Sequence, residues 1–176
     1  MDSFAPEADA RAFRNALGSF ATGVTVVTAR GPDGPVGITA NSFASVSLDP
    51  ALVLWCPARA SRRFAAFAGA EAFAVHVLAR DQQAVCDAFT RSDEGFGAVP
   101  FWEGPEGLPL IEGCLARLLC RRHALLDGGD HAIVLGRVWE AASAPGEPLV
   151  FQGGRYGGLM PAPEVHPEPS GVTESD

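Results

Sequence analysis

Hydrophobic and polar residues alternate along most of this chain in short patterns, each long enough for one strand or one short helix. Segment 8–20 carries apolar residues at helical spacing, which predicts an amphipathic helix. These residues are Ala12, Phe13, Ala16, Leu17 and Phe20. After Gly23, the β-branched run Val24–Thr28 predicts a strand. Residues 31–34 (Gly-Pro-Asp-Gly) predict a turn, and the chain resumes an extended pattern from Val36.

Two more strands and a short helix are predicted in the next part of the chain. Leu52–Cys56 and Phe73–Leu78 are apolar runs of strand length. Between them, Ser61 is expected to cap a short helix that carries Phe64 and Phe67 on one face.

The second half of the chain continues with one helix and then mostly strands. Asp81–Phe89 predicts a helix in which Asp81 is the N-cap and Val85 lies on the same side as Phe89. Segment 95–109 is rich in Gly and Pro and is expected to be a loop. The remaining predicted strands are Ala116–His123, His131–Ala141 and Leu149–Gln152.

This order of elements indicates a mainly β fold in one domain. Strands joined by tight turns favour an antiparallel barrel over a doubly wound parallel sheet. No G-x-G-x-x-G motif opens a helix after a strand, which argues against a Rossmann nucleotide site. The domain is expected to span residues 1–160. Residues 161–176 are mostly Pro, Glu, Ser and Gly, and a disordered C-terminal tail is expected there.

Composition and charge narrow the function. The chain is 47% hydrophobic with 11 Phe, as expected of a folded globular protein, and its net charge of −8 argues against nucleic acid or an anionic membrane as partner. No apolar run approaches the ~20 residues of a membrane span. All 13 basic residues are Arg, which excludes a Schiff-base lysine and a phosphate-loop lysine.

The four cysteines lie in apolar contexts and form no C-x-x-C pair. They are Cys56, Cys86, Cys114 and Cys120. With no signal peptide pattern at the N-terminus, they are expected to be reduced thiols in a cytoplasmic protein. A zinc site built from Cys114, Cys120, His123 and His131 is disfavoured because the spacings match no zinc pattern, so no metal is expected.

Segment 37–50 is the most unusual stretch of the chain. It places five short polar side chains within nine residues, beside clear strand sequence. They are Thr39, Asn41, Ser42, Ser45 and Ser47. In an extended chain Thr39 and Asn41 would share one face, and so would Ser45 and Ser47. Turn and cap roles account for such residues equally well, but a row of hydroxyls and amides also suits a flat, hydrogen-bonding heterocycle and its phosphate.

Two further segments offer polar groups for an anionic or redox ligand. Residues 56–63 end a buried strand with three Arg and Ser61 at an expected helix start, a combination that can hold a phosphate or simply face solvent. Residues 128–131 (Gly-Gly-Asp-His) form a Gly-rich turn that leads into a strand. His131 there is either a hydrogen-bonded turn residue or a working side chain.

Taken in order, four blocks of the chain resemble the flavin reductase-like family, which includes the reductase components of two-component aromatic monooxygenases. The blocks are Gly23–Thr28, Thr39–Phe43, Ser45–Pro50 and Gly129–His131 ahead of Gly136–Val138. The resemblance runs from about Phe13 to Tyr156. It implies an antiparallel Greek-key split β-barrel, the FMN-binding split barrel, with a few short flanking helices. It also implies a homodimer with flavin near the subunit interface.

The implied activity is hydride transfer from NADH or NADPH to FMN or FAD, supplying reduced flavin to a separate monooxygenase. By the same resemblance, the isoalloxazine and ribityl chain would meet Thr39, Ala40, Asn41, Ser45, Val46 and Ser47. Arg59 and Ser61 would hold the phosphate, with Ser42 and Cys56 nearby. His131 would sit beside the nicotinamide as the catalytic residue, and Tyr156 would close one side of the pocket. Phe89 is a stacking partner or a core residue, since its helical phase fits both.

Two alternatives stay open from the sequence. One is an FMN-dependent oxidase of the same fold that acts on a small substrate of its own. The other is a non-catalytic flavin or haem carrier, in which His76, His123 or His131 would be the axial ligand. No motif decides between FMN and FAD or between NADH and NADPH.

Overall fold

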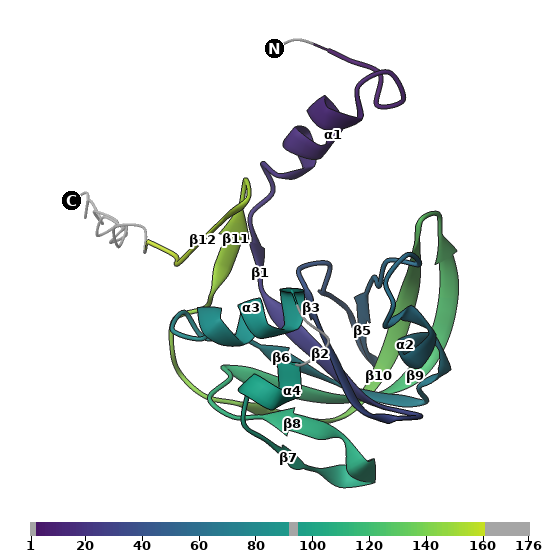
Figure 1. The fold of residues 1–176 in the computed structure, drawn as a ribbon, viewed down its shortest axis with the longest axis vertical. Coiled ribbons are helices and arrows are strands. Elements are labelled where there is room, and N and C mark those ends of the chain that lie inside the picture. The colour runs from purple at the N-terminus through teal and green to yellow at the C-terminus, as the bar shows by residue number, and fades with distance from the viewer. Residues whose placement is uncertain (1–2, 92–94, 161–176) are drawn as a thin grey trace, which may run out of the picture.

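The computed structural model describes residues 3–91 and 95–160 of the chain (Figure 1). The tail expected at 161–176 lies outside the described residues. Within the described part, no helix combines the length and the apolar character needed to cross a membrane.

A seven-stranded antiparallel sheet forms the body of the molecule, with strand order β3-β2-β6-β9-β10-β5-β4. Its strands are β2 (Thr25–Gly31), β3 (Gly34–Ala40), β4 (Ala44–Leu48), β5 (Ala51–Trp55), β6 (Ala72–Val77), β9 (Ala116–Gly128) and β10 (His131–Ser143). The two edge strands, β3 and β4, are consecutive in the chain and joined by only three residues, 41–43. No ladder pairs them among the described residues, so the sheet curls into a barrel that stays open at this seam. The predicted antiparallel, mainly β split-barrel fold is confirmed.

Strands β9 and β10 run further than their sequence patterns predict. Their hairpin pairs residues 124–128 with 131–135, beyond the predicted end at His123. Leu125 and Leu126 in this extension are exposed, so the end of the hairpin extends beyond the apolar core (Figure 1). Strand β9 therefore continues here through backbone pairing with β10 and not through burial of its own side chains.

Two smaller sheets lie beside the main one. The first has strand order β1-β11-β12, formed by β1 (Thr22–Gly23), β11 (Val150–Gln152) and β12 (Arg155–Gly157). The second is a hairpin of β7 (Phe101–Glu103) and β8 (Pro109–Ile111), with a 3₁₀ turn (Pro105–Gly107) between the strands.

The expectation of a loop over residues 95–109 is therefore wrong. This segment contains a short helix, α4 (Gly95–Ala98), as well as β7 and the 3₁₀ turn. The Gly residues that suggested a loop serve close packing instead. A side chain at Gly104 would collide with the buried side chain of Leu110, and one at Gly95 with the ring of Phe89.

Three further helices precede α4 in the chain, and two of their expected caps are wrong. They are α1 (Ala10–Leu17), α2 (Phe64–Gly69) and α3 (Gln83–Arg91). Ser61 is not the N-cap of α2, because that position belongs to Arg63, whose backbone N–H donates to the Ser61 hydroxyl at 3.3 Å. Asp81 is not the N-cap of α3, which begins two residues later, while the Gln82 side chain accepts a bond from the Ala79 N–H at 3.1 Å.

Among the described residues, His76 on β6 is the one histidine whose side chain is fully buried. Its Nδ1 lies 3.1 Å from the Val26 carbonyl oxygen, and its Nε2 accepts from the Ile111 N–H at 3.2 Å. Both ring nitrogens therefore bond backbone on neighbouring segments, which fixes the proton on Nδ1. This excludes His76 as a haem ligand in the folded chain.

Candidate functional site

The seam between β3 and β4 brings together polar side chains from distant parts of the sequence. Thr39 and Asn41, at the end of β3, line a pocket of about 150 Å³ together with Thr90 and Tyr156. The Thr39 hydroxyl donates to the Cys86 carbonyl oxygen at 2.8 Å. The Ala40 carbonyl oxygen accepts from the Thr25 hydroxyl at 2.7 Å. The fold thus brings Thr39, Asn41 and Tyr156 to one pocket, and their expected roles toward a flavin stay predictions.

Tyr156 is held in this pocket by α3. The Cys86 sulfur and the Tyr156 hydroxyl form a hydrogen bond at 3.2 Å. This bond favours the protonated phenol, and together with burial it raises the pKa of Tyr156 to about 12. Tyr156 is therefore a neutral phenol throughout the physiological range. Cys86 and Thr90 were not anticipated as site residues, since nothing in a helical apolar pattern marks which of its polar positions face a pocket.

A β-bulge at Val46 changes the predicted geometry of β4. Ser45 lies opposite Val53 and Ser47 opposite Leu52, with Val46 as the extra residue. Because Leu52 and Val53 are adjacent on β5 and point to opposite faces, Ser45 and Ser47 do too. The expectation that they share one face is wrong. The bulge instead removes Val46 from the ladder, which leaves its backbone groups available to a ligand beside the two hydroxyls.

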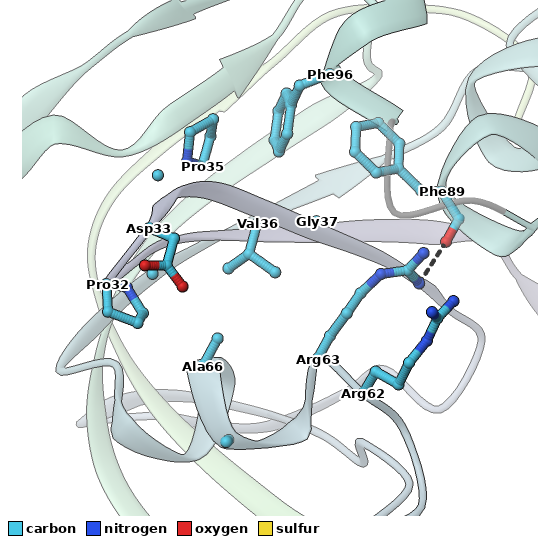
Figure 2. Close-up of a pocket in the computed structure, with 13 residues that line it drawn as sticks. Pro32, Asp33, Pro35, Val36, Gly37, Arg62, Arg63, Ala66, Phe89 and Phe96 are labelled. Carbon is cyan, nitrogen blue, oxygen red and sulfur yellow. Dashed lines mark hydrogen bonds between the residues drawn. The ribbon is translucent and has the colours of Figure 1, made fainter.

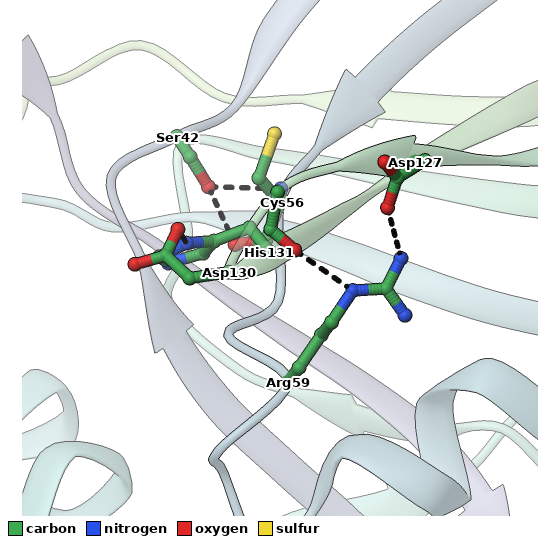
Figure 3. A network of polar contacts seen from close by, with 7 residues as sticks. Ser42, Cys56, Arg59, Asp127, Asp130 and His131 are labelled. Atoms are coloured by element: carbon green, nitrogen blue, oxygen red, sulfur yellow. Dashed lines mark hydrogen bonds and ion pairs between the residues drawn. The ribbon is translucent and has the colours of Figure 1, made fainter.

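Ser42 ties the seam to the end of β5. Its hydroxyl accepts from the Cys56 N–H at 2.9 Å and donates to the Cys56 carbonyl oxygen at 3.3 Å (Figure 3). Burial raises the pKa of the Cys56 thiol, which keeps it protonated. Both residues act in this structure by fixing the backbone at the rim of the site.

Arg59 lies against the turn of the β9–β10 hairpin. Its Nε donates to the Gly129 carbonyl oxygen at 3.0 Å, and its Nη2 pairs with Asp127 at 2.7 Å (Figure 3). The Arg59 N–H also donates to the Asp130 carbonyl oxygen at 2.9 Å. A phosphate at Arg59 would share the guanidinium with Asp127. The roles expected for Arg59 and for Ser61 as phosphate contacts stay predictions.

His131 stands on the same turn, paired with an acid that the sequence did not single out. The Asp130 carboxylate lies 2.8 Å from His131 Nδ1, and 43% of the His131 side chain is exposed. The hydrogen bond with His131 lowers the pKa of Asp130. Since a carboxylate only accepts, Nδ1 carries the proton, and Nε2 is the nitrogen that a ligand can meet. The missed signal was the Asp immediately before a candidate His.

Phe89 is a core residue in this structure. Its side chain is buried, with its ring packed edge-on against Phe96 at 4.9 Å between centroids. A Cβ at Gly37 would come within 2.5 Å of the Phe89 ring, so the ring lies directly against the β3 backbone. Stacking on a flavin would require the ring to leave this packing.

The donor set at the seam fits a flavin better than a metal. It combines hydroxyls, an amide, a neutral phenol, bulge backbone groups and one imidazole nitrogen, which together match the edge of a heterocycle with several acceptors. Among the described residues, no three His, Cys, Asp or Glu side chains are placed to share a metal ion. All four cysteines are free thiols.

Comparison with known proteins points the same way as this donor set. Residues 17–160 match the family model described as flavin reductase like domain. The chain is 54% identical over 149 residues to the FMN reductase (NADH) SmoA of Agrobacterium fabrum, covering 85% of this chain and 86% of that protein. It is 42% identical to HsaB of Rhodococcus jostii, named as a flavin-dependent monooxygenase reductase subunit, over 87% and 80% of the two chains.

Solved structures show the same relationship. The NADH:FAD oxidoreductase SgcE6 of Streptomyces globisporus superposes with a TM-score of 0.86 at 40% identity, covering 95% of this chain and 96% of that one. A second structure of that protein, in complex with NAD and FAD fragments, gives a TM-score of 0.84 over 94% and 100% of the two chains.

Proposed function

The chain belongs to the flavin reductase-like family, and we propose that it oxidises NADH and reduces FMN, which it releases to a separate monooxygenase. The 54% identity to an NADH-dependent FMN reductase supports this choice of donor and acceptor. The observation that carries the proposal is the seam itself. It gathers Thr39, Asn41 and Tyr156 in one pocket. On the β9–β10 turn, the contact of Asp130 with Nδ1 leaves Nε2 of His131 for a ligand.

In the proposed reaction, NADH and a proton are consumed with FMN, and NAD⁺ and reduced FMN leave. The flavin supplies the redox chemistry as hydride acceptor, so the chain has to supply placement and electrostatics. Hydride transfer needs donor and acceptor atoms about 3–3.5 Å apart in an aligned pair. The β4 bulge offers backbone N–H groups toward negative charge that develops on the acceptor ring. His131 Nε2 would contact and orient the nicotinamide.

We further propose that the working unit is a homodimer in a reducing compartment such as the cytoplasm. Strand β4, next to the seam, exposes Leu48 (96%) and Val46 (47%), and α1 contains no buried residue. Apolar surface of this kind beside a site marks a protein contact. The four free thiols suit a reducing compartment.

Steady-state oxidation of NADH and NADPH by the purified protein, with FMN, FAD or riboflavin in excess, tests the activity. Saturable oxidation that requires added flavin is expected, fastest with NADH and FMN. His131→Ala should raise the KM for NADH while FMN binding, followed by fluorescence titration, changes little. Flavin that copurifies without any oxidation of either nucleotide would refute the reductase and favour an oxidase or a carrier.

A further inference from the structure

A second groove lies between the β2–β3 turn and α2, with Phe89 of α3 in its lining. It measures about 380 Å³, within the range of small-molecule sites. Figure 2 shows Val36 pointing into it between Pro35 and Ala66, with Asp33 at one end and Arg62 and Arg63 at the other. Neither the hydride-transfer geometry nor the seam uses these residues.

The groove and the proposed hydride site are lined by neighbouring residues of β3 and α3. On β3, Gly37 lines the groove and Thr39 lines the Tyr156 pocket, two residues or roughly 7 Å apart. On α3, the adjacent residues Phe89 and Thr90 line the groove and the pocket respectively. The two cavities are therefore neighbours in the fold.

Charge along the groove is distributed unevenly. Arg62 and Arg63 stand at the end near Phe89, where Arg63 Nη1 donates to the Phe89 carbonyl oxygen at 3.1 Å (Figure 2). Val36 and Ala66 form an apolar middle, and the Asp33 carboxylate stands at the outer end. In a chain of net charge −8, two adjacent Arg beside a cavity mark a place for an anion.

We propose that this groove binds the adenosine 5′-phosphate half of a dinucleotide, an assignment that rests on the proposed function. The phosphates would lie against Arg62, the adenine would cover Val36 and Ala66, and Asp33 would accept from the base amino group. An adenylate carries its phosphate, its flat base and the amino group of that base in this order. Their proposed partners, Arg62, the apolar middle and Asp33, follow in the same order along the groove. NADH and FAD both carry that half, and FMN does not.

Binding of free 5′-AMP to the full chain, measured by calorimetry, tests the groove without any turnover. Arg62→Ala should weaken AMP at least fivefold. Ala65→Phe, which adds a ring at an exposed position lining the groove and leaves every charge in place, should do the same. Arg80→Ala, which removes an exposed Arg paired with Glu147 outside the groove, is the matched control and should leave AMP affinity unchanged. Equal AMP affinity in all four proteins would overturn the proposal.

Mononucleotide substrates, which lack the adenylate, show whether the groove serves NADH or FAD. They also distinguish a failure of the groove proposal from a failure of the proposed reductase activity. If the groove serves NADH, Ala65→Phe raises the KM for NADH several-fold and leaves that for reduced nicotinamide mononucleotide unchanged. If it serves FAD, the same variant weakens FAD and spares FMN. With reduced nicotinamide mononucleotide as donor and FMN as acceptor, turnover should be equally fast in every variant. If the wild type does not turn over these mononucleotides, the proposed function is contradicted. If Ala65→Phe changes neither the KM for NADH nor the affinity for FAD, only the adenylate site in the groove is refuted.

Discussion

At the residue scale, His76 shows how one buried side chain can set the pH dependence of stability. Burial lowers the pKa of His76 from 6.5 to about 4, because the charged ring would lose water while both nitrogens bond backbone. The unfolded chain binds this proton below pH 6.5 and the folded chain does not. Stability is therefore lost as pH falls from 6.5 toward 4 and then levels off with respect to this group.

We expect His76→Gln, which cannot titrate, to remove this part of the pH dependence. Between pH 7 and pH 4.5 the wild type should lose about 2 kcal/mol more unfolding free energy than the variant, because a proton bound only by the unfolded chain contributes about 1.4 kcal/mol per pH unit. Urea unfolding at the two pH values measures both changes. All other titrating groups are shared, so parallel losses in the two proteins would show that His76 accepts a proton in the folded state.

Asp130 is proposed as the positioning residue for His131. Without the carboxylate 2.8 Å from Nδ1, the imidazole can rotate and change tautomer. Loss of this hydrogen bond predicts a several-fold higher KM for NADH in Asp130→Ala. Asp130→Asn keeps an acceptor oxygen and should largely restore the KM. Flavin affinity should be the same in all three proteins, and a matching loss of FMN binding in Asp130→Ala would contradict the positioning role.

At the element scale, sequence patterns predicted the strands well and the local irregularities poorly. Periodicity placed β2 and β6 because each buries a continuous run of residues, and β5 because its apolar segment buries Val53 and Trp55. The bulge at Val46 could not be predicted, since it depends on the register between β4 and β5 and not on either sequence alone. The same limit holds for Arg59, which was recognised as a cation, whereas its partner Asp127 lies 68 residues away and becomes a neighbour only through the β9–β10 hairpin.

Packing of α3 against β3 depends on the absence of a side chain at Gly37. A Cβ at Gly37 would stand 2.5 Å from the buried Phe89 ring, so Gly37→Ala should force the helix outward and cost about 1–3 kcal/mol of stability. Gly23→Ala is the matched control, because a Cβ added at Gly23 would meet no atom within 4 Å. In a Phe89→Leu background the cost of Gly37→Ala should shrink, and thermal unfolding of the four proteins gives that coupling. Additive losses would show that Gly37 is required for another reason.

At the scale of the whole molecule, the polar side chains of the candidate site lie at the seam where the barrel sheet does not close. Strands β3 and β4 are the two sheet edges, and an exposed sheet edge usually pairs or is covered. Here the edges border the pocket of Thr39, Asn41 and Tyr156 and the exposed apolar side chain of Leu48. A second subunit placed against this seam would cover the apolar surface and enclose the ligand with one contact.

Helix α1 supplies the test of that arrangement. It projects away from the barrel (Figure 1), buries none of its residues and is followed by Phe20, with Leu17 and Phe20 exposed at 60% and 77%. An isolated helix of eight residues is marginal in water, so its apolar face needs a partner, which we take to be the second copy. Leu17→Glu with Phe20→Glu should convert a dimer into a monomer in light scattering after gel filtration, and Met160→Glu, at another exposed apolar position, should not. If FMN affinity falls with the dimer, the partner completes the flavin site; a dimer that survives the double substitution would place the interface elsewhere.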